Sequence, residues 1–263
     1  MTSVTSRPVP ADESELEYLP ENPLITRLWE ANYDPYTQEI LGGLAIGPEW
    51  RCLDVGAGGG SMSAWLAERS GAVVAVDLHT EALDALASPR LSVRRADITT
   101  CAFEPASFDL ILVRAVLSVL EDPFALLEQA VRWLAPGGWL LAEDFYFMPA
   151  DDTPTANARR VIEAYTAAMR AGGMDARLGR RLPSALARAG LDPVELRVRP
   201  LGPGQGESEN ALMRARMELQ GQPLIDNGLL TAADIAEFVG SFERPAARDV
   251  TTLQFSAWGR RPA

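Results

Sequence analysis

The stretch from Cys52 to Asp77 constrains the fold of this chain more than any other part of it. An apolar strand runs into the turn Gly56-Ala57-Gly58-Gly59-Gly60, a helix follows, and a second apolar strand, Val73 to Val76, ends on Asp77. Glycine adopts backbone angles that a β-carbon forbids, so the chain can turn sharply there and approach a ligand closely. The pattern predicts a β-α-β unit in a buried parallel sheet.

The helix of this unit begins directly beside the glycine turn, where Ser61 or Ser63 can cap it. Its free amide groups would then point back at a bound molecule. The second strand brings the carboxylate of Asp77 to the rim of the sheet, where a ribose could offer it two hydroxyls. The unit therefore favours a ligand that contains a nucleoside.

The glycine spacing distinguishes between two classes of nucleotide site. The dehydrogenase fingerprint has glycines at its first, third and sixth positions. Counting from Gly56, this turn has them at the first, third, fourth and fifth positions, with Ser61 sixth. The spacing weakens the interpretation as a nicotinamide-dependent oxidoreductase, which stays open as an alternative.

The turn and the segments after it resemble a known family. Asp54-Val55-Gly56-Ala57-Gly58-Gly59-Gly60 is similar to the D/E-x-G-x-G-x-G motif of class I S-adenosylmethionine-dependent methyltransferases. Ala96-Asp97-Ile98 resembles the segment that holds the adenine in that family, and Pro136-Gly137-Gly138 resembles the LxPGG turn before its fifth strand. The resemblance extends from about Ile46 to Phe145.

Two outer segments, Tyr33-Asp34-Pro35-Tyr36 and Trp258-Gly259-Arg260-Arg261-Pro262, resemble actinobacterial small-molecule methyltransferases. The resemblance implies an α/β fold: a Rossmann-like, doubly wound, mostly parallel seven-stranded sheet with an N-terminal helical lid and a helical insertion before the last strand. It divides the chain into an N-terminal tail and lid (1–45), a cofactor-binding core (46–150), and a helical cover with closing strands of the same domain (151–263).

The segments outside the core have helical and strand patterns of their own. Helices are predicted over 16–31 and 36–44, with Tyr18 in the lid, and over 155–171, 183–189, 210–220 and 232–241. Strands are predicted over 139–143, 194–199 and 251–258. The loop Gly202-Pro203-Gly204-Gln205-Gly206 could be a hinge of the cover.

Candidate site residues follow from the resemblance and from their place at the sheet edge. S-adenosylmethionine, with S-adenosylhomocysteine as its product, is expected to contact Asp54, Gly56, Ala57, Gly58, Gly60, Asp77, Leu78, Asp97, Ile98 and Arg114. The methyl acceptor is expected to contact Trp29, Tyr33, Tyr36, Phe145, Met213 and Met217.

A general base is not obvious in this sequence. The resemblance implies a histidine after the fourth strand, where this chain has Val119, and the only histidine, His79, follows the ribose-binding acid on the wrong side of the glycine turn. Asp144 and Tyr146, at the carboxyl end of the fifth strand, are better placed as catalytic groups. Asp144 could instead cap a turn, and Arg114 could form an internal ion pair.

The composition argues against several partners. A net charge of −12 and a pI near 4.6 oppose binding to nucleic acid or to an anionic membrane. Met1 to Asn22 holds no apolar signal segment, so we expect a cytoplasmic monomer or homodimer. Cys52 and Cys101 are expected to be reduced packing residues, and Asp151-Asp152 a solvated loop, so no metal site is predicted.

The function that the resemblance implies is S-adenosylmethionine-dependent methyl transfer to an oxygen, nitrogen or carbon atom of a small metabolite, in secondary metabolism. A second possibility keeps the cofactor but uses only its sulfonium charge, without methyl transfer. The sequence leaves the acceptor open, because fold analogy alone does not fix chemistry.

Overall fold

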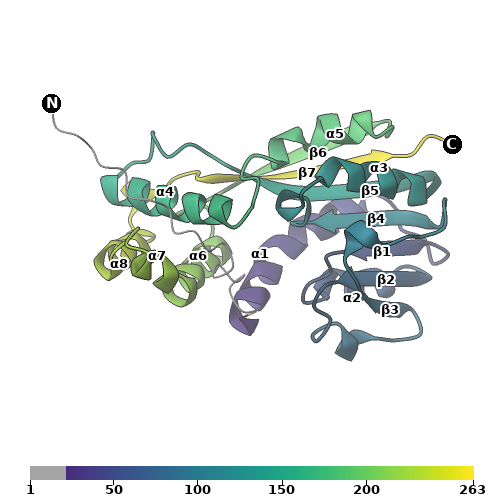
Figure 1. Ribbon diagram of the computed structural model, residues 1–263, viewed down its shortest axis with the longest axis horizontal. Coiled ribbons are helices and arrows are strands. Elements are labelled where there is room, and N and C mark those ends of the chain that lie inside the picture. Colours follow the sequence, from purple (N-terminus) through teal and green to yellow (C-terminus); the bar gives the residue numbers. More distant parts are fainter. Residues whose placement is uncertain (1–21) are drawn as a thin grey trace.

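A computed structural model describes residues 22–263 of the chain. Tyr18 and the first part of the helix predicted over 16–31 lie outside the described residues. Seven strands form one sheet in the order β3-β2-β1-β4-β5-β7-β6 (Figure 1). Their bounds are β1 Arg51–Val55, β2 Ala72–Asp77, β3 Leu91–Arg95, β4 Phe108–Arg114, β5 Leu134–Phe147, β6 Val194–Leu201 and β7 Thr252–Arg260.

β1 to β5 pair in parallel with one another, and β7 lies antiparallel between β5 and β6. The helices are α1 Pro23–Gly42, α2 Ser61–Ala67, α3 Pro123–Trp133, α4 Ala156–Ala171, α5 Leu182–Arg188, α6 Glu207–Gln220, α7 Gln222–Asp226 and α8 Ala232–Ser241. The predicted fold class is confirmed: an α/β, Rossmann-like, mostly parallel seven-stranded sheet with helices inserted before the last strand.

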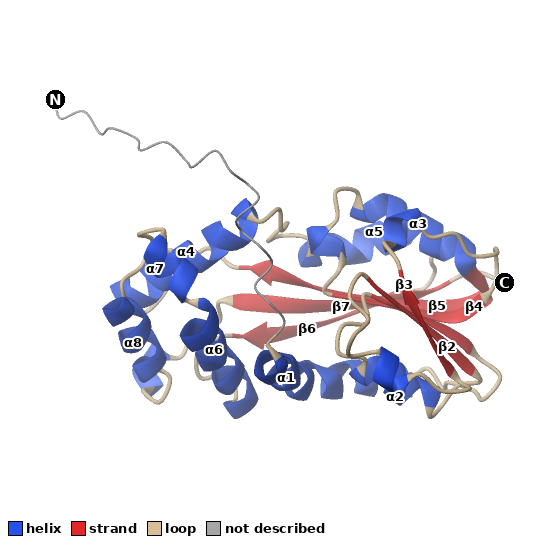
Figure 2. Cartoon of the chain, turned by 60° about the horizontal axis from the view of Figure 1, so that its bottom comes forward, coloured by secondary structure: helices blue, strands red, loops and turns tan. Residues whose placement is uncertain are grey.

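The helices lie in three groups around the sheet. α1 and α2 cover one face, and α3 and α5 cover the other (Figure 2). The remaining helices, α4, α6, α7 and α8, gather at the far end of β5, β6 and β7, and we call them the cap (Figures 1 and 2). Among residues 22–263, no helix is both long and apolar enough to cross a bilayer.

Alternate residues of the central strands supply two separate cores. Leu53, Ile111 and Val113 belong to the cluster on the α3 and α5 side, whereas Cys52 and Leu110 belong to the cluster on the α1 and α2 side. Successive side chains of a strand point to opposite faces, so a strand covered on both faces is apolar throughout. A third cluster lies inside the cap and joins α4, α7 and α8.

Two local predictions were wrong. The two helices expected over 16–31 and 36–44 are one continuous helix, α1, with Pro35 inside it. Proline removes one helical hydrogen bond, but burial of Tyr33, Ile40 and Leu41 along the helix compensates for that loss. Neither predicted serine caps α2: its N-cap is Gly60, which makes no side-chain cap.

β5 is longer than predicted at both ends. The sequence predicted a strand over 139–143, whereas the structure has Leu134–Phe147. β5 pairs with β7 from Trp139 to Phe147, well past its last partner in β4. This extension carries the sheet from the core to the cap, so the cap is attached to the core by regular strand pairing.

Candidate functional site

The glycine turn and Asp77 form one hydrogen-bonded unit. The Gly58 amide donates to Oδ2 of Asp77 at 2.8 Å, and the His79 amide donates to Oδ1 at 2.9 Å. Gly56, Gly58 and Gly60 have φ of +65°, +54° and +85°, a region that favours glycine. Nothing lies within 4 Å of the position that a β-carbon of Gly58 would take. The structure therefore brings together the loop and the acid that the motif predicted.

The other glycines of the turn make room for protein side chains rather than for open space. A β-carbon at Gly56 would overlap Val116, one at Gly59 would overlap Glu30 of α1, and one at Gly60 would overlap Leu83. Only the backbone around Gly58 faces open space, because the neighbouring glycines are in contact with packed side chains.

The predicted adenine side lies along the ends of β2 and β3. The side chain of Leu78 is 58% exposed directly after Asp77, which is unusual for a leucine next to a buried strand. Asp97 is also exposed, and its Oδ1 accepts hydrogen bonds from the amide and the hydroxyl of Thr99 at 2.8 and 2.7 Å. These bonds lower the pKa of Asp97. Ile98 is buried beneath this edge. The exposed ends of β2 and β3 thus present an apolar side chain and a carboxylate, which suit an apolar base and a polar group of an adenosine.

Asp54 lies beneath the turn rather than in it. Its carboxylate is 3% exposed, and Oδ2 accepts a hydrogen bond of 2.5 Å from Ser63 Oγ in α2. Burial raises its pKa to about 6. The hydrogen bond between Asp54 and Ser63 therefore connects β1 to α2 and stabilises the turn between them. Direct contact of Asp54 with a cofactor stays a prediction.

Arg114 forms the internal ion pair that the sequence left as an alternative. Its Nη1 lies 2.7 Å from Oδ1 of Asp34, and both side chains are largely buried. Its guanidinium also stacks on Trp29, 4.5 Å from the ring centroid. The ion pair between Arg114 and Asp34 connects α1 to the end of β4. A role for Arg114 in cofactor binding stays a prediction.

Glu30 is a site residue that the sequence did not indicate. It reaches from α1 to the glycine turn and hydrogen bonds with Ser61, and burial followed by the charge of Asp34 raises its pKa. No local motif marks it, because its contact joins segments that are far apart in the chain. A carboxylate at this place could bind an ammonium group.

The two predicted catalytic residues lie on the face of β5 that α5 covers. Asp144 is 1% exposed; its Oδ2 accepts from the Ser118 amide and its Oδ1 from its neighbour Phe145, each at 2.9 Å. Burial raises its pKa to about 6. Tyr146 packs edge-on against Phe255. Asp144 thus ties the segment after β4 to β5, and the catalytic roles of both residues stay predictions.

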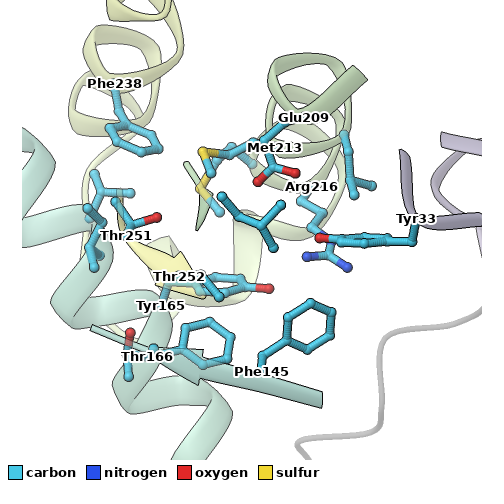
Figure 3. A pocket seen from close by; sticks show the side chains of 16 residues that line it. Tyr33, Phe145, Tyr165, Thr166, Glu209, Met213, Arg216, Phe238, Thr251 and Thr252 are labelled. Carbon is cyan, nitrogen blue, oxygen red and sulfur yellow. The ribbon is translucent and has the colours of Figure 1, made fainter. Parts of the chain in front are cut away.

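A cavity of about 80 Å³ lies on the opposite side of β5, between α1, the cap, and the ends of β5 and β7 (Figure 3). Most of its lining is apolar. Of the predicted acceptor-binding residues, Tyr33, Phe145, Met213 and Met217 line it. Trp29 and Tyr36 are outside that lining, because Trp29 stacks on Arg114 and Tyr36 on Arg199.

Charged groups in this cavity were missed at the sequence level. Glu209 and Arg216, both on α6, line it together with the phenols of Tyr33 and Tyr165 (Figure 3). A signal was present: Glu209, Leu212, Met213 and Arg216 follow helical spacing, which puts two charges on an apolar face. In the part of the chain that the structure describes, no three His, Cys, Asp or Glu side chains are grouped as metal ligands would be.

Comparison with known proteins agrees with this geometry. Residues 53–142 match the family model described as a methyltransferase domain. Over these residues the chain is similar to a methyltransferase domain. The matched segment runs from within β1 to within β5 and includes the glycine turn, Asp77 and Asp97. The predicted resemblance to S-adenosylmethionine-dependent methyltransferases is therefore confirmed over these residues.

Similar proteins extend the comparison. A ubiquinone biosynthesis O-methyltransferase from Paracidovorax citrulli is 32% identical over 108 residues, which cover 38% of this chain and 45% of that protein. This chain spans about half the length of the curated relatives that it matches.

Solved structures share the fold at lower identity. Phosphoethanolamine N-methyltransferase 2 from Haemonchus contortus, in complex with phosphomonomethylethanolamine and S-adenosylhomocysteine, has a TM-score of 0.61 and 17% identity, covering 88% of this chain and 53% of that one. The [4+2]-cyclase SpnF has a TM-score of 0.57 and 19% identity, covering 89% and 83%. At these identities the likeness concerns the fold alone.

Proposed function

We propose that this chain binds S-adenosylmethionine at the carboxyl ends of β1, β2 and β4 and catalyses methyl transfer to an oxygen, nitrogen or carbon atom of a small metabolite. The unit formed by Gly58 and Asp77 carries the proposal, since it lies inside the matched domain and faces open space. A cytoplasmic location and a role in secondary metabolism belong to the proposal, on the sequence patterns given above.

The residues of the site suit the parts of this cofactor. Asp77 keeps lone pairs that could accept the two ribose hydroxyls. Leu78 and Asp97 would lie along the adenine, while Glu30 and Arg114 would meet the ammonium and the carboxylate of the methionine part. The cofactor supplies a methyl group on a positively charged sulfur.

The contribution of the protein is mainly orientation and exclusion of water. The cavity beside α1 would hold the acceptor with its reacting atom toward the cofactor. Orientation of two reactants can contribute roughly 7 to 11 kcal/mol in well-aligned systems. The identity of the acceptor atom is not fixed by the relatives, since one is named an O-methyltransferase and another an N-methyltransferase.

Calorimetric titration with S-adenosylmethionine and S-adenosylhomocysteine tests the proposal. The unaltered protein should bind both, and Asp77→Asn should lower their affinity about 10- to 150-fold, the equivalent of losing about 1.5–3 kcal/mol from hydrogen bonds to a charged group. Glu81→Gln is the control, because Glu81 is exposed and forms only a surface pair with Arg95.

Failure of the unaltered protein to bind either compound at millimolar concentration would refute the proposal. Methyl transfer itself requires a second measurement: the protein is incubated with a cell extract and methyl-labelled S-adenosylmethionine. Release of S-adenosylhomocysteine with a labelled product supports transfer. Binding without either product would favour use of the sulfonium charge alone.

A further inference from the structure

Four polar groups converge at one end of the cavity. Tyr33 from α1, Tyr165 from α4, and Glu209 and Arg216 from α6 all line it, and Figure 3 shows Glu209, Arg216 and the two phenols directed toward the same space. We call these four residues the polar end. The rest of the lining is largely apolar, so a ligand would meet its strongest electrostatic interactions here.

Glu209 is held firmly at the polar end. It is 5% exposed, and its Oε2 accepts a hydrogen bond of 2.5 Å from Nδ2 of Asn32. Burial raises its pKa, against the lowering effects of Asn32, Arg216 and Arg199. The groups that act on Glu209 are Asn32 and Tyr33 from α1, Arg199 from β6, Arg216 from its own helix, and the backbone of Gly202; Tyr165 acts on Tyr33. A carboxylate in such surroundings is a stronger base than one in water.

The polar end and the glycine turn are both in contact with α1. Glu30 of α1 contacts the glycine turn, and Asn32, two residues later, contacts Glu209. Two successive residues turn a helix by more than half a revolution, so Glu30 and Asn32 lie on opposite sides of α1, and this helix contacts both sites. Trp29 and Tyr33 form adjacent rings on α1, 4.7 Å apart. Because Trp29 also stacks on Arg114 at the end of β4, we infer that the reacting atom of an acceptor lies at the polar end.

A second observation points to a ligand in this cavity. The hydroxyl of Thr166 lines it, is 7% exposed as a residue, and makes no hydrogen bond with any described residue. Buried hydroxyls are normally hydrogen-bonded. In Figure 3 Thr166 lies across the cavity from Arg216. A ligand with a polar group at each end could bind the polar end with one group and hydrogen bond with the Thr166 hydroxyl with the other.

We propose that the cavity binds a flat, single-ring acceptor that carries an acidic hydroxyl, and that Glu209 takes the hydroxyl proton while Arg216 stabilises the oxyanion. This inference rests on the proposed function. The O–H bond breaks, the proton moves to a carboxylate oxygen of Glu209, and the electron pair stays on the acceptor oxygen, which thereby becomes the nucleophile for the methyl group. The proton leaves Glu209 for water when the product departs.

The size of the cavity limits the acceptor. At about 80 Å³ it is smaller than usual ligand pockets of about 300–1,000 Å³. Met213 and Met217 line it, and unbranched methionine side chains can move to admit one ring. A large polycyclic acceptor would require movement of α6 itself.

The first test measures binding without turnover. 4-Nitrophenol has a hydroxyl at one end and a hydrogen-bond acceptor at the other, and its absorbance changes on ionisation. Bound in the presence of S-adenosylhomocysteine, it should ionise at lower pH in Glu209→Gln and at higher pH in Arg216→Met than in the unaltered protein. Each shift should be about one pH unit or more, because each variant removes one adjacent charge. Glu207→Gln, an exposed position on the same helix, should cause no shift.

The second test compares acceptors of different acidity. Glu209→Gln should lower kcat/KM for 4-methylphenol by about 100-fold or more, since a general base contributes typically 10²–10⁴-fold. The loss for 4-nitrophenol should be much smaller, because its hydroxyl is far more acidic and is already partly ionised near neutral pH. A purely structural role of Glu209 would lower both rates equally and would overturn the assignment.

Binding of S-adenosylhomocysteine separates failure of this inference from failure of the proposed function. If Glu209→Gln binds it like the unaltered protein, the variant is folded and the cofactor site is intact. Unaltered protein that binds S-adenosylhomocysteine but neither binds nor methylates the phenols would contradict the inference alone. Methylation of 4-methylaniline in their place would assign the cavity to amines.

Discussion

At the scale of single residues, the carboxylate of Asp54 is stabilised by one short hydrogen bond from Ser63 and destabilised by complete burial. Its pKa is raised to about 6, whereas an unfolded aspartate titrates near 3.9, about two units lower. Between these values the folded state binds the proton more tightly. Its stability therefore falls as pH rises through this window, and stays lower above about pH 6.

Replacement of Asp54 by Asn removes this pH dependence. The amide oxygen of Asp54→Asn can still accept from Ser63, and no charge is buried. The free energy of unfolding, measured by urea denaturation at several pH values, should fall less between pH 4 and pH 6 than in the unaltered protein. The difference should be about 1–3 kcal/mol, given 1.36 kcal/mol for each pKa unit.

Asp84→Asn is a suitable control, because Asp84 is exposed. The free energy of unfolding of Asp84→Asn should change with pH as that of the unaltered protein does. Asp144, which is also buried with a raised pKa, contributes in the same direction to both curves and cancels in the comparison. Identical pH dependence in Asp54→Asn and the unaltered protein would contradict the role of burial at this site.

The contacts between site residues that the sequence predicted are local ones. Gly58 and Asp77 are 19 positions apart within one β-α-β unit, so a spacing pattern records their relation. Asn32 and Glu209 are 177 positions apart and meet only because α1 packs on α6. No sequence motif with a fixed spacing therefore marks such a pair. The same holds for Asp34 and Arg114, 80 positions apart, whose pairing the sequence could offer only as an alternative.

At the scale of elements, Arg199 joins three parts of the molecule. From β6 it donates to the backbone oxygen of Asn32 at 2.7 Å and to its Oδ1 at 2.8 Å, and its guanidinium stacks 3.8 Å from the ring of Tyr36. Asn32 in turn donates to Glu209. The position of α1 against α6, and with it the wall of the cavity, depends on this arginine.

Arg199→Met should loosen α1 and α6 while leaving the central sheet intact. Loss of two charge-assisted hydrogen bonds should lower the free energy of unfolding by about 1.5–3 kcal/mol. Hydrogen exchange should become faster in α1 and α6 and stay unchanged in β1 and β4. Arg197→Met is the matched control, since Arg197 forms only an exposed pair with Glu39, worth about 0–1 kcal/mol. Equal effects of the two substitutions would count against this role for Arg199.

Element predictions succeeded where one chemical signal decided the outcome. The helix predicted over 155–171 is α4, which Thr155 caps, and the helix predicted over 232–241 is α8, which Thr231 caps. Predictions failed where tertiary packing determines the bounds of an element. Burial stabilises α1 as one helix in spite of Pro35, and pairing with β7 lengthens β5. The length of a strand depends on its neighbours, which local periodicity does not contain.

At the scale of the whole molecule, the cap and the core share strands. β5 pairs with β4 in the core and continues along β7 to Phe147, which lines the cavity under the cap. The cap also has an apolar cluster of its own, in which Phe238 is 2% exposed and packs edge-on against Phe242 at 5.1 Å. The shared strands predict that residues 151–263 unfold together with the core, as parts of one domain.

Phe238→Ala tests whether the molecule unfolds as one unit. Removal of a buried phenylalanine typically costs about 3–5 kcal/mol. The six tryptophans, at positions 29, 50, 65, 133, 139 and 258, all lie outside the cap helices, so their fluorescence reports on α1 and the core. If cap and core are coupled, the fluorescence transition of Phe238→Ala should shift down by about 6–20 °C, taking 2–4 °C per kcal/mol for a chain near this size. An unchanged fluorescence transition, with early loss of helical circular dichroism, would instead show that the cap unfolds alone.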